Sequence, residues 1–136
     1  MNPISGTWSG VFTYDSEEYQ EEFMRFQLIL DEKKGILSGQ CQDSIEDGGI
    51  PIAATIEGFI EGDNISFVKK YPYLIYMDES GEYKKDDSQP HPEIHYHGVF
   101  ENGMLKGSWE MTIGSFNEGE DIITEQITGQ WEMTKL

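Results

Sequence analysis

The segment that decides the fold is Leu105-Lys-Gly-Ser-Trp-Glu-Met-Thr-Ile113. Its large apolar residues recur at odd numbers, namely Leu105, Trp109, Met111 and Ile113. Successive side chains of a β-strand point to opposite faces, so this alternation predicts a strand with one buried and one solvated face. No window of about ten residues shows the 3.6-residue period of an amphipathic helix.

The same alternation recurs along the chain and predicts about eight strands in all. The further segments lie at residues 6–14, 24–30, 37–41, 52–60, 65–71, 94–100 and 127–133. Most connections have the length of hairpin turns, and Asn102-Gly103 is the strongest signal because a type I′ turn needs positive φ at both central residues. Residues 43–49 and 114–121 look like looser loops. Sequential strands joined by short turns pair antiparallel, and eight of them form either a sandwich or a barrel.

Glycines favour the barrel over the sandwich. Seven of them share the inward parity of their strands: Gly6, Gly10, Gly39, Gly58, Gly98, Gly107 and Gly129. Glycine weakens a strand, and the crowded inner face of a tightly coiled barrel gives a reason for it there. Large aromatic side chains can then lie over the bare backbone. We therefore expect one all-β domain over residues 1–136, an antiparallel up-and-down barrel of about eight strands.

The first strand opens with Gly6-Thr7-Trp8, and the Gly-x-Trp pattern recurs at Gly107 and Gly129. This start resembles that of the calycin-type barrels, which include lipocalins, avidins and fatty-acid-binding proteins. The last strand lacks the arginine that lipocalins place beside this tryptophan. The 15–22 connection is too short for the helical lid of fatty-acid-binding proteins, and the tryptophan spacing does not match the biotin site of avidin. The resemblance implies a barrel that holds a ligand, without naming the ligand.

The net charge of the chain excludes some classes of binding partner, and its cysteine content indicates little thiol chemistry. The chain has 26 acidic and 9 basic residues and a formal net charge of −17. Polyanions are repelled by such a surface, so we expect no nucleic acid and no anionic membrane as partner. Cys41 is the single cysteine, and its inward parity predicts an inert core thiol. Residues 1–8 show no signal peptide and no apolar run reaches a transmembrane length, so we expect a cytoplasmic protein.

Two charged residues have inward parity. Asp43 continues the face of Leu37 and Cys41, and Lys69 continues the face of Ile65 and Phe67. A buried lysine needs a partner, so Lys69 either awaits a ligand carboxylate or pairs with Asp43 at one end of the barrel. Alternatively, both side chains lie at the rim, where lysine reaches water.

Three tyrosines share the inner parity: Tyr14, Tyr71 and Tyr96. They can donate hydrogen bonds to a ligand, or they can be core residues with their hydroxyls at the rim. Lys69, Tyr71, Tyr96, Tyr14 and Asp43 are therefore the candidate ligand-binding residues.

The sequence contains few residues in a pattern typical of a metal site or of a catalytic site. His91, Glu93, His95 and His97 alternate along one face, but the apolar parity belongs to their neighbours, so the histidines point outward. The sequence has no nucleophile elbow and no phosphate-binding glycine loop. We predict no metal site, no cofactor and no catalytic residues.

The leading hypothesis is a non-enzymatic barrel that binds a small apolar or amphipathic molecule, with Lys69 as its polar anchor. A rival hypothesis is a protein-interaction module or homodimer with an interior filled by side chains. The outward apolar residues that motivate it are Val11, Ile29, Phe59, Val68 and Val99. An enzyme working at the barrel mouth is a third alternative. Residues 73–92 form either a lid, with Tyr73 and Tyr76 capping the interior, or a hairpin.

Overall fold

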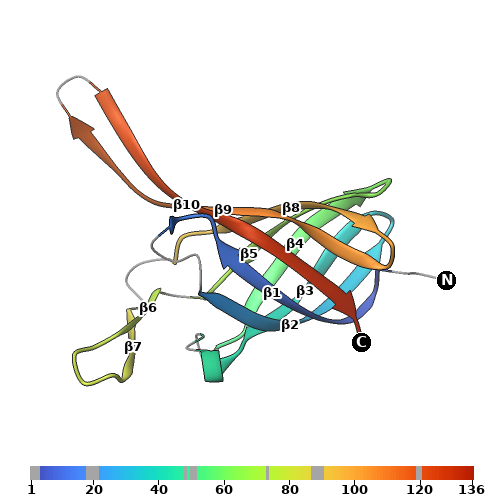
Figure 1. Cartoon of the computed structure of the whole chain (residues 1–136), viewed down its shortest axis with the longest axis horizontal. Helices are drawn as coiled ribbons and strands as arrows, with labels where there is room; N and C mark the ends of the chain where they lie inside the picture. Colours follow the sequence, from blue (N-terminus) through green and yellow to red (C-terminus); the bar gives the residue numbers. More distant parts are fainter. Residues whose placement is uncertain are drawn as a thin grey trace.

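Antiparallel strands close into a barrel in the computed structural model, which describes residues 4–17, 22–47, 49, 52–72, 74–86, 91–118 and 121–136 (Figure 1). Around the barrel the order is β1-β10-β9-β8-β5-β4-β3-β2, and every pair is antiparallel. The barrel strands are β1 (Gly6–Tyr14), β2 (Phe23–Lys33), β3 (Ile36–Asp43), β4 (Ala54–Glu61), β5 (Asn64–Lys70), β8 (Ile94–Glu101), β9 (Met104–Glu118) and β10 (Asp121–Lys135). This confirms the eight-stranded antiparallel up-and-down barrel that the sequence predicts.

Two tight turns fix the register of their hairpins. Asn102 and Gly103 have φ of 55° and 77°, as a type I′ turn requires. Lys34 and Gly35, between β2 and β3, have φ of 52° and 83°. Positive φ at both central residues matches the twist of the flanking strands, so each turn sets which residues face the interior.

Apolar side chains fill one end of the interior, which we call the closed end. Trp8 at the start of β1 is fully buried, and its indole Nε1 donates to the carbonyl oxygen of Ile4 at 2.8 Å. The same core cluster includes Leu28, Leu30, Leu37, Ile56, Ile65, Leu105 and Met133, each at most 2% exposed. The interior at this end is therefore packed side chains, as expected for a small eight-stranded barrel.

The inner-face glycines allow close approach, as the sequence predicts. A Cβ at Gly107 would lie 1.8 Å from the carbonyl oxygen of His97, so no other residue fits without separating β8 from β9. A Cβ at Gly129 would lie 2.4 Å from Nε1 of Trp109, and one at Gly98 would lie 2.8 Å from the Trp131 ring. Two tryptophan rings thus lie over glycine backbone that carries no side chain. This confirms the prediction that inner-face glycines make room for large aromatic side chains.

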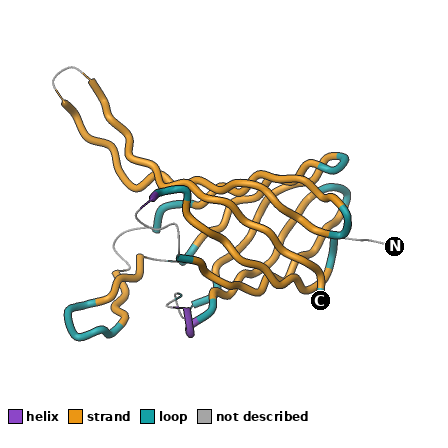
Figure 2. The backbone as a smooth tube through the Cα atoms, in the orientation of Figure 1, coloured by secondary structure: helices purple, strands orange, loops and turns teal. Residues whose placement is uncertain are grey.

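The predicted loop over residues 114–121 is wrong. Strands β9 and β10 continue through it to Glu118 and from Asp121, and the register between them shifts between Glu125 and Gln126. Beyond this irregularity the two strands form a ribbon that projects from the barrel (Figure 2). The sequence suggested a loop because glycine and acidic residues interrupt the apolar alternation there, but a ribbon outside the barrel needs no buried face.

A second hairpin occupies part of residues 73–92. Strands β6 (Leu74–Met77) and β7 (Tyr83–Asp86) pair with each other and form a separate two-stranded sheet. The hairpin lies at the same end of the barrel as the β9–β10 ribbon (Figure 1). Tyr73 and the side chain of Tyr76, which the lid interpretation placed over the interior, lie outside the described residues. A short 3₁₀ helix, η2 (Ile45–Asp47), follows β3.

Candidate functional site

A cavity of about 250 Å³ opens at the end of the barrel opposite Trp8, which we call the mouth. Strand β1 ends there at Tyr14 and β3 ends there at Asp43, while Tyr71 follows directly after β5. Its aromatic and apolar wall includes Phe12, Tyr14, Met24, Trp109, Met111 and Ile127. Its polar side chains are Asp43, Tyr71, His91 and Tyr96. The interior is therefore packed at the closed end and hollow at the mouth.

A buried ion pair lies beside the cavity. The Nζ of Lys69 donates to Oδ1 of Asp43 at 2.7 Å, and the two side chains are 1% and 5% exposed. The hydroxyl of Tyr71 donates to the other carboxylate oxygen of Asp43. The Cys41 thiol, two residues earlier on β3, lies 4.0 Å from Oδ1 of Asp43. Both oxygens of the carboxylate are thus satisfied inside the protein.

The strand register explains why these residues meet. In β3 the inward residues end with Cys41 and Asp43, and in β5 they end with Lys69. Lys69 pairs across the strands with Ile56 of β4 and with Ile94 of β8. Its side chain passes over the inner face of β4 and reaches Asp43 on β3. The alternation rule predicted this parity, and the burial of both residues excludes the rim interpretation.

Burial shifts the pKa values of several groups around the ion pair. Burial alone lowers the pKa of Lys69, but Tyr96, Cys41, Tyr71 and Asp43 together outweigh it and raise that pKa well above its usual value. Burial also raises the pKa of the Cys41 thiol, to about 11, and that of both tyrosines. At neutral pH the Lys69 ammonium is therefore charged, while the thiol and both phenols stay neutral.

Three rings of the wall stand nearly perpendicular to one another. The ring centroids of Phe12 and Tyr14 are 5.8 Å apart at 72°, those of Phe12 and Trp109 are 5.6 Å apart at 73°, and those of Tyr14 and Trp109 are 5.4 Å apart at 85°. We call these three residues the aromatic corner. The indole Nε1 of Trp109 donates to the Thr13 carbonyl at 3.0 Å, which fixes the orientation of that ring.

All five predicted ligand-binding residues come together at this end of the barrel. Tyr14, Asp43, Tyr71 and Tyr96 line the cavity, whereas Lys69 reaches it only through Asp43. Its Nζ also lies 5.4 Å from the ring centroid of Phe12 and 5.2 Å from that of Tyr71. The ammonium is therefore held behind the wall by an ion pair and two aromatic faces.

Sequence reasoning missed Phe12, Trp109 and His91 as cavity residues. The inward parity of Phe12 and Trp109 was visible, but the pattern does not tell which end of the barrel is hollow. His91 lies before β8, where parity gives no information, and its ring centroid is 4.7 Å from that of Tyr71. Its Nδ1 donates to the carbonyl oxygen of Pro92 at 2.8 Å.

His95 and His97 have separate neighbours on the outer face of β8. Nδ1 of His97 lies 3.1 Å from the hydroxyl of Ser66, and Nε2 of His95 lies 3.9 Å from a carboxylate oxygen of Glu93. Within the part of the chain that the structure describes, no three histidine, cysteine or acidic side chains are grouped to hold a metal ion. In the same residues, no helix has the length and apolar character to cross a membrane.

Comparisons with known proteins add little to this geometry. No protein-family model matches the chain, and no curated protein does. Among solved structures, the chain is similar to the crystal structure of rhizavidin, at 16% sequence identity and a TM-score of 0.47. The similarity covers 94% of this chain and 83% of that chain. At this level it carries no information about ligand or assembly. What the chain's own structure defines is an up-and-down barrel with an aromatic cavity at its mouth.

Proposed function

We propose that the protein binds a small, largely apolar molecule with one polar end in the cavity at the barrel mouth. The observation that carries the proposal is the cavity itself, with aromatic and apolar walls and polar groups gathered around Asp43. Mostly apolar walls with a few convergent polar groups are typical of ligand pockets.

The size of the cavity limits the ligand. Ligand pockets usually have volumes of about 300–1,000 Å³, and an apolar cavity of about 150 Å³ already holds benzene. A volume of about 250 Å³ therefore suits a molecule of one or two rings, or a short branched chain. A long fatty acid does not fit inside it.

The candidate residues take separate roles in this proposal. Tyr14, Tyr71 and Tyr96 line the cavity, and the Tyr71 hydroxyl, which donates to Asp43, meets the polar end of the ligand as an acceptor. Lys69 acts as a positioning residue because its ammonium holds the Asp43 carboxylate in place. The anchoring of a ligand carboxylate directly on Lys69, expected from the sequence, would first require Lys69 to leave Asp43.

The test uses prodan, 6-propionyl-2-(dimethylamino)naphthalene, a neutral fluorescent probe with two fused rings that matches the size of the cavity. We expect its emission to rise when it is added to the wild-type protein, and to stay low with Met111→Trp, which fills the cavity. Thr112→Trp is the matched control, since it adds the same indole to the exposed face of the same strand. Equal enhancement by all three proteins would place the probe outside the barrel. No enhancement by folded wild type would contradict the proposal.

A second candidate function has its own observation. Ile36 on β3 and Phe59 on β4 are direct partners across the strands, and they are 63% and 52% exposed. Large apolar side chains exposed side by side can mark an interaction surface. In this alternative the protein is an interaction module or a homodimer. Sedimentation velocity on wild type and Phe59→Ser tests it: a dimer lost in the variant supports it, and a monomeric wild type at high concentration rejects the homodimer.

A further inference from the structure

The aromatic corner and Asp43 give the cavity a particular electrostatic character. The face of an aromatic ring carries negative charge, and a cation within about 6 Å of a ring centroid is attracted to it. Tyr14 and Trp109 border the cavity at 85° to each other, so a ligand there meets both rings. The Phe12 ring supports them, since it faces Nζ of Lys69 at 5.4 Å and stacks on Phe26 at 6.3 Å. A cage of this kind accepts alkylated ammonium groups, whose low hydration makes their desolvation cheap.

The strand register preorganises the corner. Phe12 and Tyr14 are alternate residues of β1, and Tyr14 is paired with Gly129 of β10, which is paired with Trp109 of β9. The missing side chain at Gly129 is what allows the indole to lean over β10 toward β1. With its Nε1 bonded to the Thr13 carbonyl, the Trp109 ring needs no rearrangement before a ligand binds.

The charges around the cavity favour a cation over an anion. Asp43 lines the cavity, and the compensating Lys69 lies behind it. Among the described residues that line the cavity there is no lysine or arginine, and His91 is the one side chain that can become cationic. A ligand carboxylate would therefore meet a carboxylate, phenols and ring faces.

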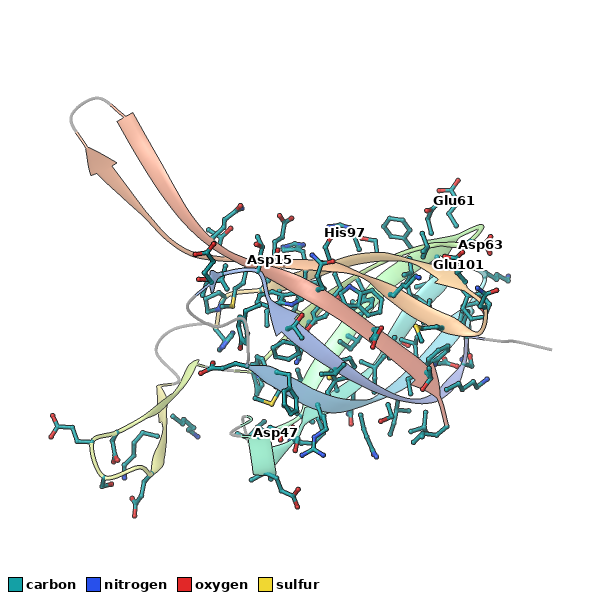
Figure 3. The ribbon with its side chains drawn as sticks, viewed as in Figure 1. Asp15, Asp47, Glu61, Asp63, His97 and Glu101 are labelled. Atoms are coloured by element: carbon teal, nitrogen blue, oxygen red, sulfur yellow. The ribbon has the colours of Figure 1, made fainter. Side chains whose placement is uncertain are left out.

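Long-range electrostatics act in the same direction. The net charge of −17 concentrates cations near the protein and depletes anions. Asp15 lies at the mouth end of the barrel, and Asp47 lies there too but is paired with Arg25 at 2.8 Å (Figure 3). Lys69 opposes a second cation because its Nζ lies 5.4 Å from the Phe12 ring, but its charge is matched by Asp43 at 2.7 Å.

We propose that the ligand is a small organic cation, with an alkylated ammonium head seated against Tyr14 and Trp109 and facing Asp43. This inference rests on the proposed function, because it names the chemical class that the same cavity takes. A trimethylammonium group with a short chain fits a volume of about 250 Å³. The polar end that the proposed function requires is then the cationic head.

The experiment compares three molecules of nearly the same shape by calorimetric titration at physiological salt. They are choline, its uncharged isostere 3,3-dimethylbutan-1-ol, and the anion 3,3-dimethylbutanoate. We expect choline to bind roughly fivefold to thirtyfold more tightly than the alcohol, the scale of one to two cation–π contacts, and the anion to bind most weakly. Equal binding of choline and the alcohol, or preference for the anion, would overturn the inference.

A pair of variants shows whether the corner causes the preference. Tyr14→Phe keeps the ring and should keep the choline preference, whereas Tyr14→Leu should lose most of it while binding the alcohol nearly as before. Equal preference in both variants would remove Tyr14 from the cation site and contradict the proposed corner. The wild-type ranking needs no variant, so a poorly folded Tyr14→Leu leaves the test intact.

The two proposals fail in different ways. If prodan binds in the cavity but choline does not bind more tightly than its isostere, the cation inference is wrong and the binding function stands. If choline, its isostere and the fluorescent probe all fail to bind the folded wild-type protein, both proposals are wrong.

Discussion

Lys69 and Asp43 form an ion pair 2.7 Å long in which the lysine side chain is 1% and the aspartate side chain 5% exposed. One member comes from β5 and the other from β3, so the contact crosses the strand between them. Two charges removed from water stabilise a protein only while both are present, because either one alone is a buried unpaired ion. The pair lies between the packed closed end and the cavity, and so it links stability to the site.

The first prediction concerns this pair. We expect Lys69→Met and Asp43→Asn each to lower the free energy of unfolding by about 3–5 kcal/mol, since each leaves a buried group without its partner. The double variant should cost clearly less than the sum of the two. Urea unfolding followed by tryptophan fluorescence measures all three. Additive costs would mean that the two charges do not interact in the folded protein.

Trp8 is the subject of the second prediction. Its side chain is fully buried at the closed end and its indole donates to the Ile4 carbonyl. Trp8→Ala should lower the free energy of unfolding by about 3–5 kcal/mol, the usual cost of truncating a buried large aromatic side chain. Ile45→Ala is the control, because Ile45 is 63% exposed and should cost no more than about 0.5 kcal/mol. A urea midpoint of Trp8→Ala close to that of wild type would show that Trp8 is not part of the core.

The third prediction tests the close approach of β8 and β9. Gly107 and Gly98 are direct partners, and a Cβ at Gly107 would collide with the His97 carbonyl oxygen and with the Gly98 Cα. Gly107→Ala must therefore separate the strands, and we expect a loss of about 1–3 kcal/mol, as for other overpacked sites. Ser108→Ala, the next residue on the exposed face, should change stability little. Thermal unfolding of both variants checks this, and equal melting temperatures would contradict it.

Much of this fold follows from local rules that act on the sequence. Period-two alternation places Asp43 and Lys69 inside because each continues the parity of its strand. Positive φ at Asn102 and Gly103 fixes a hairpin for a reason that is visible in the two residue types. Inner-face glycines indicate a barrel because only a crowded interior needs them.

The features that the sequence did not predict depend on how the strands and loops are arranged in space. Parity tells that Phe12 and Trp109 face inward, but not that they border a cavity rather than the packed end. The alternation of apolar and polar residues does not predict the extension of β9 to Glu118, because the ribbon formed by β9 and β10 leaves the barrel there. His91 reaches the cavity from a segment outside the strands, where no periodic pattern applies.

The last prediction concerns the loss of folding stability at alkaline pH. The pKa of the Cys41 thiol rises from 9.0 to about 11 because the group is buried, and the pKa of Tyr71 and that of Tyr96 rise for the same first reason. A raised folded-state pKa means that the folded protein keeps its proton at a pH where the unfolded chain has lost it. The stability from Cys41 is therefore complete below pH 9 and is lost as the pH rises through 9 toward 11.

We expect the urea midpoint of the wild-type protein to fall steadily between about pH 9 and pH 11, and the Cys41→Ala variant to fall less steeply over the same range. Thiol labelling gives an independent readout. At pH 8 a pKa of about 11 leaves roughly one hundredth of the thiolate of an ordinary thiol of pKa 9.0, so 5,5′-dithiobis(2-nitrobenzoate) should react slowly with the native protein and quickly in urea. Native labelling as fast as that of the unfolded chain, or a midpoint that rises with pH, would show that Cys41 is accessible and that its burial does not hold the proton.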